Sequence, residues 1–254
     1  MAEWCLTDSA DVHKTTESAM KASFVAMDLA YEASFQPMYF EIAERGPALL
    51  KSMHKNLSSY GYIGSGDMQV FGGTSLSDAG VRVSMFNQHA RIEISATSCI
   101  IRFTQMSNSA DLRLCKACVS AVEDVLNGEL ANPRFGFYSL DPLCWLDLKG
   151  VSATDFLADL VTTKNPLQLS RQEGVRIHRG VNIELENDLA QWNAIMNLFR
   201  VRDNPSQIMF SCRVIYGEDS SIRGSTSQIE HLEELMNLFF SDVGLEVFDF
   251  EVEN

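Results

Sequence analysis

Alternation of apolar and polar residues in the second half of the chain limits the fold more than any other feature. In the segment 173–187 one parity is apolar apart from Arg179 and the two end residues: Val175, Ile177, Val181, Ile183 and Leu185. The segment 206–217 alternates in the same way: Ile208, Phe210, Cys212, Val214 and Tyr216. A period of two places successive side chains on opposite faces of a strand. We therefore predict strands that bury one face, with a third strand between them near residues 193–203.

The first half carries the same signature between residues 80 and 105. Its inward positions are apolar: Val81, Val83, Met85, Ile92, Ile94, Cys99, Ile101 and Phe103. A turn near Asn87 and another at Ala96-Thr97 separate three such runs. Short strands joined by tight turns are typical of an antiparallel meander.

Four helices are expected between these strands. Residues 46–61 begin with Pro47 in the first turn, and residues 109–128 carry an apolar stripe at helical spacing. Ser152 with Asp155, and Ser227 with Glu230, resemble capping boxes that open the other two helices. The mixture predicts an α+β fold with largely antiparallel sheets and helices packed on one side.

Short matches between the halves suggest a duplication. The segment 36–50 resembles 141–157, and 79–85 resembles 173–179. Each half then reads as a strand, a helix, a meander, a helix and a strand. We predict a polar N-terminal arm over 1–20, a first α+β repeat over 21–135 and a second over 136–254. The two sheets would either pack together or join edge to edge.

The charge balance restricts the classes of partner. The chain has 254 residues and a formal net charge of −14, which repels a phosphate backbone and fits a basic protein partner. The sequence contains no run of about 18 apolar residues, so we predict no membrane-spanning helix. The N-terminal 17 residues lack the pattern of a secretory signal, so we expect a cytoplasmic protein with reduced cysteines.

Cys115 and Cys118 form a C-x-x-C pair within the apolar stripe of the helix 109–128. A structural zinc site needs about four ligands, and the sequence offers no second pair. A redox pair usually lies at a helix N-terminus, which these residues do not. We interpret both as packed core thiols and expect no metal and no cofactor.

Signatures of catalysis are missing from the sequence. There is no Gly-Lys-Ser/Thr phosphate loop, no H-E-x-x-H and no G-x-S-x-G, and the five histidines lack ligand spacing. The Gly-rich stretch 61–73 reads as a connector. We therefore favour a non-catalytic protein and nominate no catalytic residue, although an enzyme without a local motif stays open.

Two polar surfaces are candidates for binding a partner. Arg176, His178, Asn182 and Glu184 share the polar parity of one predicted strand. Glu230, Glu233 and Glu234 form an acidic face on the predicted C-terminal helix, opposite its apolar stripe. Either surface also reads as an ordinary solvated face.

The order of 38–46, a helix, strands that include 79–85, then 143–150, a helix and 173–180 resembles the layout of DNA sliding clamps. That resemblance implies a ring around DNA, whose inner helices carry basic residues. The first helix fits this expectation with Arg45, Lys51 and Lys55, whereas the last helix is acidic.

Three functions follow. The leading hypothesis is a protein-binding or scaffold subunit, of the adaptor or inhibitor type. The first alternative is a clamp-like ring, and only there would nucleic acid be a partner. The second alternative is a small-molecule binder or a cryptic enzyme whose cleft between the repeats is lined by Trp145, Trp192 and Tyr138. A homo-oligomer is compatible with all three.

Overall fold

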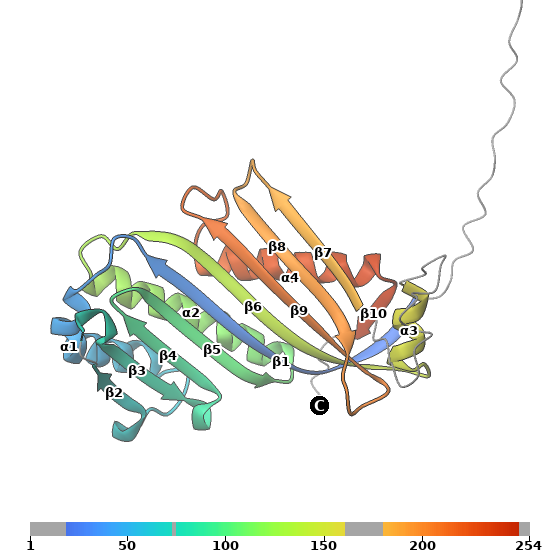
Figure 1. Ribbon diagram of the computed structural model, residues 1–254. Coiled ribbons are helices and arrows are strands. Elements are labelled where there is room, and N and C mark those ends of the chain that lie inside the picture. Colours follow the sequence, from blue (N-terminus) through green and yellow to red (C-terminus); the bar gives the residue numbers. More distant parts are fainter. Residues whose placement is uncertain (1–18, 73–74, 161–179, 249–254) are drawn as a thin grey trace, which may run out of the picture.

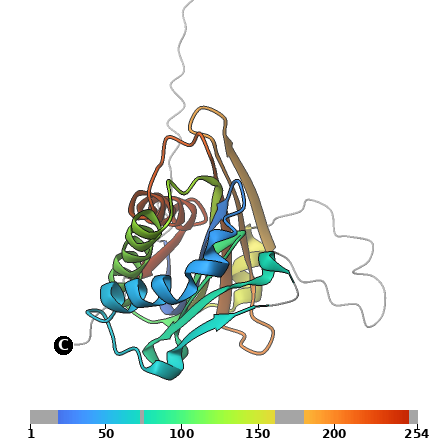
Figure 2. The ribbon, with the colours of Figure 1, turned by 90° about the vertical axis from the view of Figure 1, so that its left-hand side faces the viewer.

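Ten strands form one sheet, and the helices lie on one side of it (Figures 1 and 2). The computed structural model describes residues 19–72, 75–160 and 180–248. The predicted α+β fold with largely antiparallel strands is confirmed, because the one parallel pairing recorded is between β1 and β10. None of the helices in the described ranges is both long and apolar enough to cross a membrane.

Each half of the chain contains two helices, with several consecutive strands between them. The first half contains β1 (Met20–Phe35), α1 (Glu41–Leu57), β2 (Met68–Phe71), β3 (Gly80–Met85), β4 (Ala90–Ser95), β5 (Ser98–Met106) and α2 (Ser109–Glu129). The second half contains β6 (Phe135–Leu148), α3 (Ala153–Leu160), β7 (Gly180–Asn187), β8 (Trp192–Arg200), β9 (Gln207–Gly217), α4 (Ser225–Asp242) and β10 (Leu245–Phe248). Three single-turn 3₁₀ helices flank β2 and β3: Ser65–Asp67, Leu76–Asp78 and Phe86–Gln88.

The sheet is organised around its two longest central strands. Its order is β2-β3-β4-β5-β1-β6-β9-β8-β7, and β1 pairs with β6 in antiparallel fashion along nearly its whole length. Each half therefore runs from a central strand through a helix and a meander to a second helix. The halves join through one continuous sheet, and the predicted boundary between residues 135 and 136 falls at the start of β6. Duplication and the division into two repeats stay predictions.

Strand β1 is the main element that the sequence analysis missed. It follows the expected polar arm, and the layout had placed the first strand at residues 38–46, which instead form the approach to α1 and its first turn. The signal was present, because Met27, Leu29, Tyr31 and Ala33 alternate with polar or small residues and are buried.

Two predicted helix starts were wrong. Helix α1 begins at Glu41 rather than at residue 46, so Pro47 lies inside it. Ile42 lies two helical turns before Leu49 and therefore on the same face of the helix. The extra turn forms because this position buries Ile42 fully. Helix α4 begins at Ser225, two residues before the predicted capping box.

The start of α4 is set by a contact from another helix. Glu123 of α2 accepts hydrogen bonds from the Ser225 backbone N–H and from the Ser225 hydroxyl, the latter at 2.7 Å. A carboxylate at this point satisfies a free donor of the first helical turn and interacts favourably with the helix dipole. The Tyr31 hydroxyl also donates to Glu123, at 2.9 Å. For α3, in contrast, the predicted cap is confirmed, since Ser152 accepts from the Asp155 N–H at 3.1 Å.

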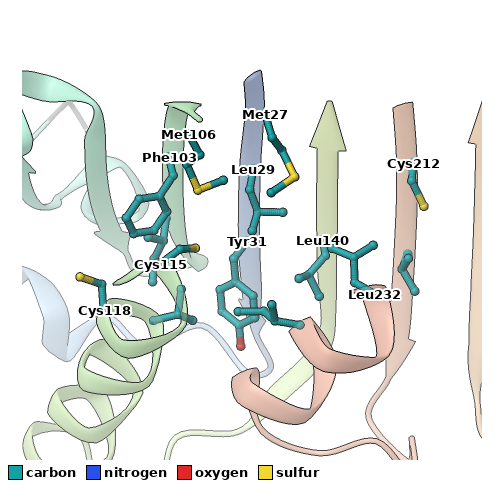
Figure 3. Packing of buried hydrophobic residues seen from close by; sticks show 14 of the residues in the cluster. Met27, Leu29, Tyr31, Phe103, Met106, Cys115, Cys118, Leu140, Cys212 and Leu232 are labelled. Atoms are coloured by element: carbon teal, nitrogen blue, oxygen red, sulfur yellow. The ribbon is translucent and has the colours of Figure 1, made fainter. Parts of the chain in front are cut away.

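The core lies between the helices and the inner face of the sheet. Figure 3 shows Cys115 of α2 and Leu232 of α4 in the layer beneath the sheet, whose inward residues there include Phe103, Leu29, Leu140 and Cys212, while Cys118 lies on the side of α2 further from β1. The predicted inward residues of β3, β4, β5 and β9 are all buried. Alternation thus predicted correctly which side of each of these strands would be dry.

Candidate functional site: the open face of the sheet

The side of the sheet that faces away from the helices carries half-buried and exposed residues from eight strands, β1 and β3 to β9. We call this side the open face. Because side chains alternate, each strand that buries apolar residues against the helices presents its other parity here. In Figure 2 the helices α1, α2 and α4 lie on one side of the sheet, which leaves the strands on the opposite side. The open face is therefore a surface on which side chains can vary without disturbing the core.

Three arginines surround one glutamate at the first-half end of the open face. Arg82 and Arg91 each place a guanidinium nitrogen close to Glu93 Oε1, at 2.6 Å and 2.7 Å. Arg102 Nη1 lies 3.4 Å from Glu93 Oε2. These residues come from β3, β4 and β5, so the pairing of neighbouring strands brings them together. We call Arg82, Arg91, Glu93 and Arg102 the arginine cluster.

The electrostatics of the cluster are unbalanced. Burial by itself would raise the pKa of Glu93, but the hydrogen bonds and charges of Arg91 and Arg82 outweigh it and hold the pKa below its usual value. Glu93 is therefore ionised at neutral pH. One carboxylate cannot neutralise three guanidinium groups, so the cluster retains two positive charges. Arg82 also lies over the ring of Phe71, 5.3 Å from its centroid, which fixes that side chain further.

An apolar row crosses the centre and the second half of the open face. Trp145 of β6 is directly opposite Met209 of β9, and Met209 is opposite Phe199 of β8. On the same face, Leu143 lies two residues from Trp145 along β6. Further along the strands, Ile195 of β8 is opposite Arg213 and Ile215 of β9 is opposite Asn193, and Ile195 is 41% exposed. We call the six apolar residues the apolar patch. A half-buried tryptophan beside half-buried aromatic and aliphatic residues is a composition typical of protein-binding surfaces.

Amides and a salt bridge lie between the members of the apolar patch. Asn182 of β7 donates to Asn197 of β8 at 2.6 Å. Two guanidinium nitrogens of Arg213 in β9 contact the carboxylate of Asp141 in β6. Nε lies 2.7 Å from Oδ1, and Nη2 lies 3.3 Å from Oδ2. This pair is balanced in charge, unlike the arginine cluster.

The residues predicted to bind a partner divide between two sides of the molecule. Asn182 and Glu184 are exposed on the open face, as the alternation predicted. Arg176 and His178 lie outside the described residues. Glu230, Glu233 and Glu234 belong to α4, on the helical side.

Glu233 is not part of a free acidic face. Its carboxylate lies 2.8 Å from the Lys116 ammonium of α2, and both side chains are partly buried. The pair bridges the long helices of the two halves. Of the three predicted glutamates, only Glu230 and Glu234 are exposed. Whether any of these residues binds a partner stays a prediction.

The arginine cluster was missed as a site. Arg91 and Glu93 are two residues apart in the sequence, and the sequence analysis nominated neither. Arg82, Arg91, Glu93 and Arg102 all have outward parity, which alternation alone could have indicated. What the sequence did not give is the register that sets Arg91 opposite Arg102.

The five cysteines in the described residues are packed in the core. Cys99, Cys115, Cys118, Cys144 and Cys212 are buried and unpaired, and burial raises the pKa of each thiol, for Cys118 to about 12. Such thiols are not thiolates at neutral pH and are poor nucleophiles. In the part of the chain that the structure describes, no cluster of three or more His, Cys, Asp or Glu residues could hold a metal ion.

The aromatic residues expected to line a cleft do not meet. Trp145 lies on the open face, whereas Tyr138 and Trp192 pack against the core on the helical side. Trp192 contacts the His231 ring edge-on, with centroids 4.8 Å apart. A cavity of about 270 Å³ does lie between the halves, bordered by Leu112 of α2 and by Leu232 and Met236 of α4. None of the three predicted aromatics lines it.

Comparison with known proteins assigns no family to this chain. No protein-family model matches it, and a search of curated proteins found no significant match. Function must therefore be argued from the surface itself.

Proposed function

We propose that the protein is a non-catalytic binding or scaffold subunit that docks a protein partner on the open face of its sheet. The observation that carries this proposal is the apolar patch, a tryptophan-centred row on a sheet face opposite the helices. Protein interfaces combine buried aromatic anchors with a polar rim. Here Trp145 and Phe199 supply the aromatic groups, and Asn182, Asn197 and the Arg213–Asp141 pair supply the polar groups.

The charge of the helical side supports this function over a clamp-like ring. In a clamp the helices would face DNA, yet α4 exposes Glu230 and Glu234, and α2 exposes Asp124. These carboxylates repel a phosphate backbone. Of the basic residues of α1, Arg45 donates to the carbonyl of Glu129. A ring that uses these helices to surround DNA is therefore the weaker proposal.

A second candidate is the binding of a small apolar ligand in the cavity between α2 and α4. The cavity is lined mostly by aliphatic and aromatic side chains from both halves. Its volume of about 270 Å³ falls just below the usual range of ligand sites, which begins at about 300 Å³. A rise in melting temperature with a small apolar probe such as benzene or indole, abolished by Leu232→Trp, would support this candidate.

The protein-docking proposal is tested by crosslinking in the native host. A photoreactive amino acid at Ile195 would lie on the open face, and one at Leu238 of α4 serves as the matched control. Both wild-type side chains are exposed, at 41% and 62%. We expect one defined protein to crosslink from Ile195 and not from Leu238. Crosslinking from Leu238 alone would place the interface on the helices instead.

Charge substitutions make the test quantitative. Ile195→Asp should weaken binding of the crosslinked partner at least about tenfold, as expected when a charge is buried in an interface without a counterion. Leu238→Asp should leave affinity unchanged. Neither variant should change the unfolding midpoint greatly, since both positions are exposed. Equal affinity for Ile195→Asp and the wild type would contradict docking on the apolar patch.

A further inference from the structure

We infer that the arginine cluster is a binding site for one phosphate monoester, carried by a phosphorylated segment of the protein partner. This inference rests on the proposed function, because it assigns a second contact to the same open face. It concerns a region separate from the apolar patch, so the two can be tested independently.

The strand register places like charges against each other. Arg91 of β4 is directly opposite Arg102 of β5, and the same cross-strand row continues to Ser84 on one side and Ala30 on the other. Like charges in direct cross-strand pairs destabilise a sheet. Both Arg91 and Arg102 are exposed, so their guanidinium groups can be reached from solvent. The arrangement is unfavourable for folding alone and favourable for holding an anion.

The charge of the cluster matches a doubly charged anion. Three guanidinium groups face one carboxylate, and Glu93 already occupies part of their hydrogen-bonding capacity. A phosphate monoester carries a charge of about −1.5 to −2 at neutral pH and offers three acceptor oxygens. Arginine forks bind such oxygens in pairs. A single carboxylate would neutralise about half of the remaining charge.

The surroundings favour one isolated phosphate over a nucleic acid. Elsewhere on the open face lie Glu184, Glu186 and Asp141, and the whole chain carries a net charge of −14. Glu32 is directly opposite Ile100 of β5. The strand next to the arginine cluster therefore already carries a negative charge. A strand of phosphates would meet these carboxylates, whereas one phosphoserine or phosphothreonine fits within the arginines.

The binding test uses the full chain and a short synthetic peptide. The probe is a five-residue peptide with one phosphoserine flanked by glycine and alanine, measured by NMR titration or calorimetry. We expect saturable binding that weakens with added salt. The unphosphorylated peptide should not bind, and inorganic phosphate should bind more weakly than the phosphopeptide. A single-stranded oligonucleotide that binds more tightly than the phosphopeptide would overturn the proposal.

Matched arginine variants locate the site. Arg102→Gln should lower affinity for the phosphopeptide about tenfold, as for the loss of one charged hydrogen-bond donor. Arg213→Gln, at the other end of the open face, should leave that affinity unchanged. The melting temperature of Arg102→Gln should not fall, because removing it relieves the repulsion from Arg91. Equal weakening by both variants, or none by Arg102→Gln, would overturn the assignment.

Failure of this inference can be separated from failure of partner docking. Ile195→Asp should bind the phosphopeptide as the wild type does, even though it loses the partner. If the peptide does not bind while Ile195→Asp still abolishes partner docking, the phosphate site is wrong and the open face remains the interface.

Discussion

The two halves of the sheet are alike on the inner face and different on the open face. Facing the helices, β3 to β5 and β7 to β9 both present aliphatic and sulfur-containing side chains, among them Ile101 and Cys212. Facing outward, β3 to β5 carry the arginine cluster with its excess of positive charge. The corresponding positions of β7 to β9 carry asparagines, glutamates and part of the apolar patch. Close packing restricts which residues the inner face can carry. The open face contacts solvent, so its residues can vary more freely.

This contrast indicates where selection for binding could act. A core position tolerates few changes, because interiors are close-packed and even one methylene is felt. An outward position on a strand is restrained mainly by its cross-strand neighbours, with energies below about 1 kcal/mol. The halves can therefore share an architecture while offering a charged surface at one end and an apolar one at the other.

The largest expected effect tests whether the inner faces are equivalent. Ile101→Ala in β5 and Phe210→Ala in β9 should each lower the free energy of unfolding by about 3–5 kcal/mol, through lost burial and a residual cavity. Both side chains are almost fully buried. Urea unfolding monitored by circular dichroism measures this. A loss below about 1 kcal/mol in either half would show that its core is not packed as described.

A second prediction concerns the contact that joins the halves. Glu123→Ala removes the acceptor for Tyr31 and Ser225, and should lower the free energy of unfolding by about 2 kcal/mol. Lys116→Ala, which breaks the other bridge between α2 and α4, is the comparison and should cost less because that pair is more exposed. If the order were reversed, the α4 start would not depend on Glu123.

A third prediction follows from the lowered pKa of Glu93. A group with a depressed folded-state pKa stabilises the fold above its unfolded pKa of about 4.3, and that contribution disappears as pH falls through the folded value. Glu93→Gln should therefore cost about 0.5–1 kcal/mol at pH 7. At pH 2 to 3 the difference from the wild type should shrink. A constant difference over this range would show that the charge of Glu93 is not responsible.

The smallest effect has opposite signs in the two halves. Arg102→Gln should leave stability unchanged or raise it by a few tenths of a kcal/mol, since Arg91 is its cross-strand neighbour. Arg213→Gln should lower stability by about 0.5 kcal/mol, because it breaks a two-point salt bridge with Asp141. Differential calorimetry at low salt suits shifts of this size. Equal signs would remove the electrostatic contrast between the two ends of the open face.

Part of the candidate site could be predicted from the sequence. Alternation identified Asn182 and Glu184 as outward residues of a strand, and the structure places them on the open face. The acidic residues of the last helix were expected to share one surface, but Glu233 pairs with Lys116. Helical spacing fixes the direction of a side chain relative to its own helix and contains no information about the neighbouring helix.

By itself the sequence determined which side of most strands is dry and that α2 buries its cysteines, because these are local periods of two and 3.6 residues. Only the tertiary structure decided that β1 and β6 form the centre of one sheet, that Glu123 starts α4, and that Arg82, Arg91 and Arg102 meet around Glu93. Each of those outcomes depends on which distant segments become neighbours. Pairing of that kind is settled by the combined packing of the whole chain, which no local pattern records.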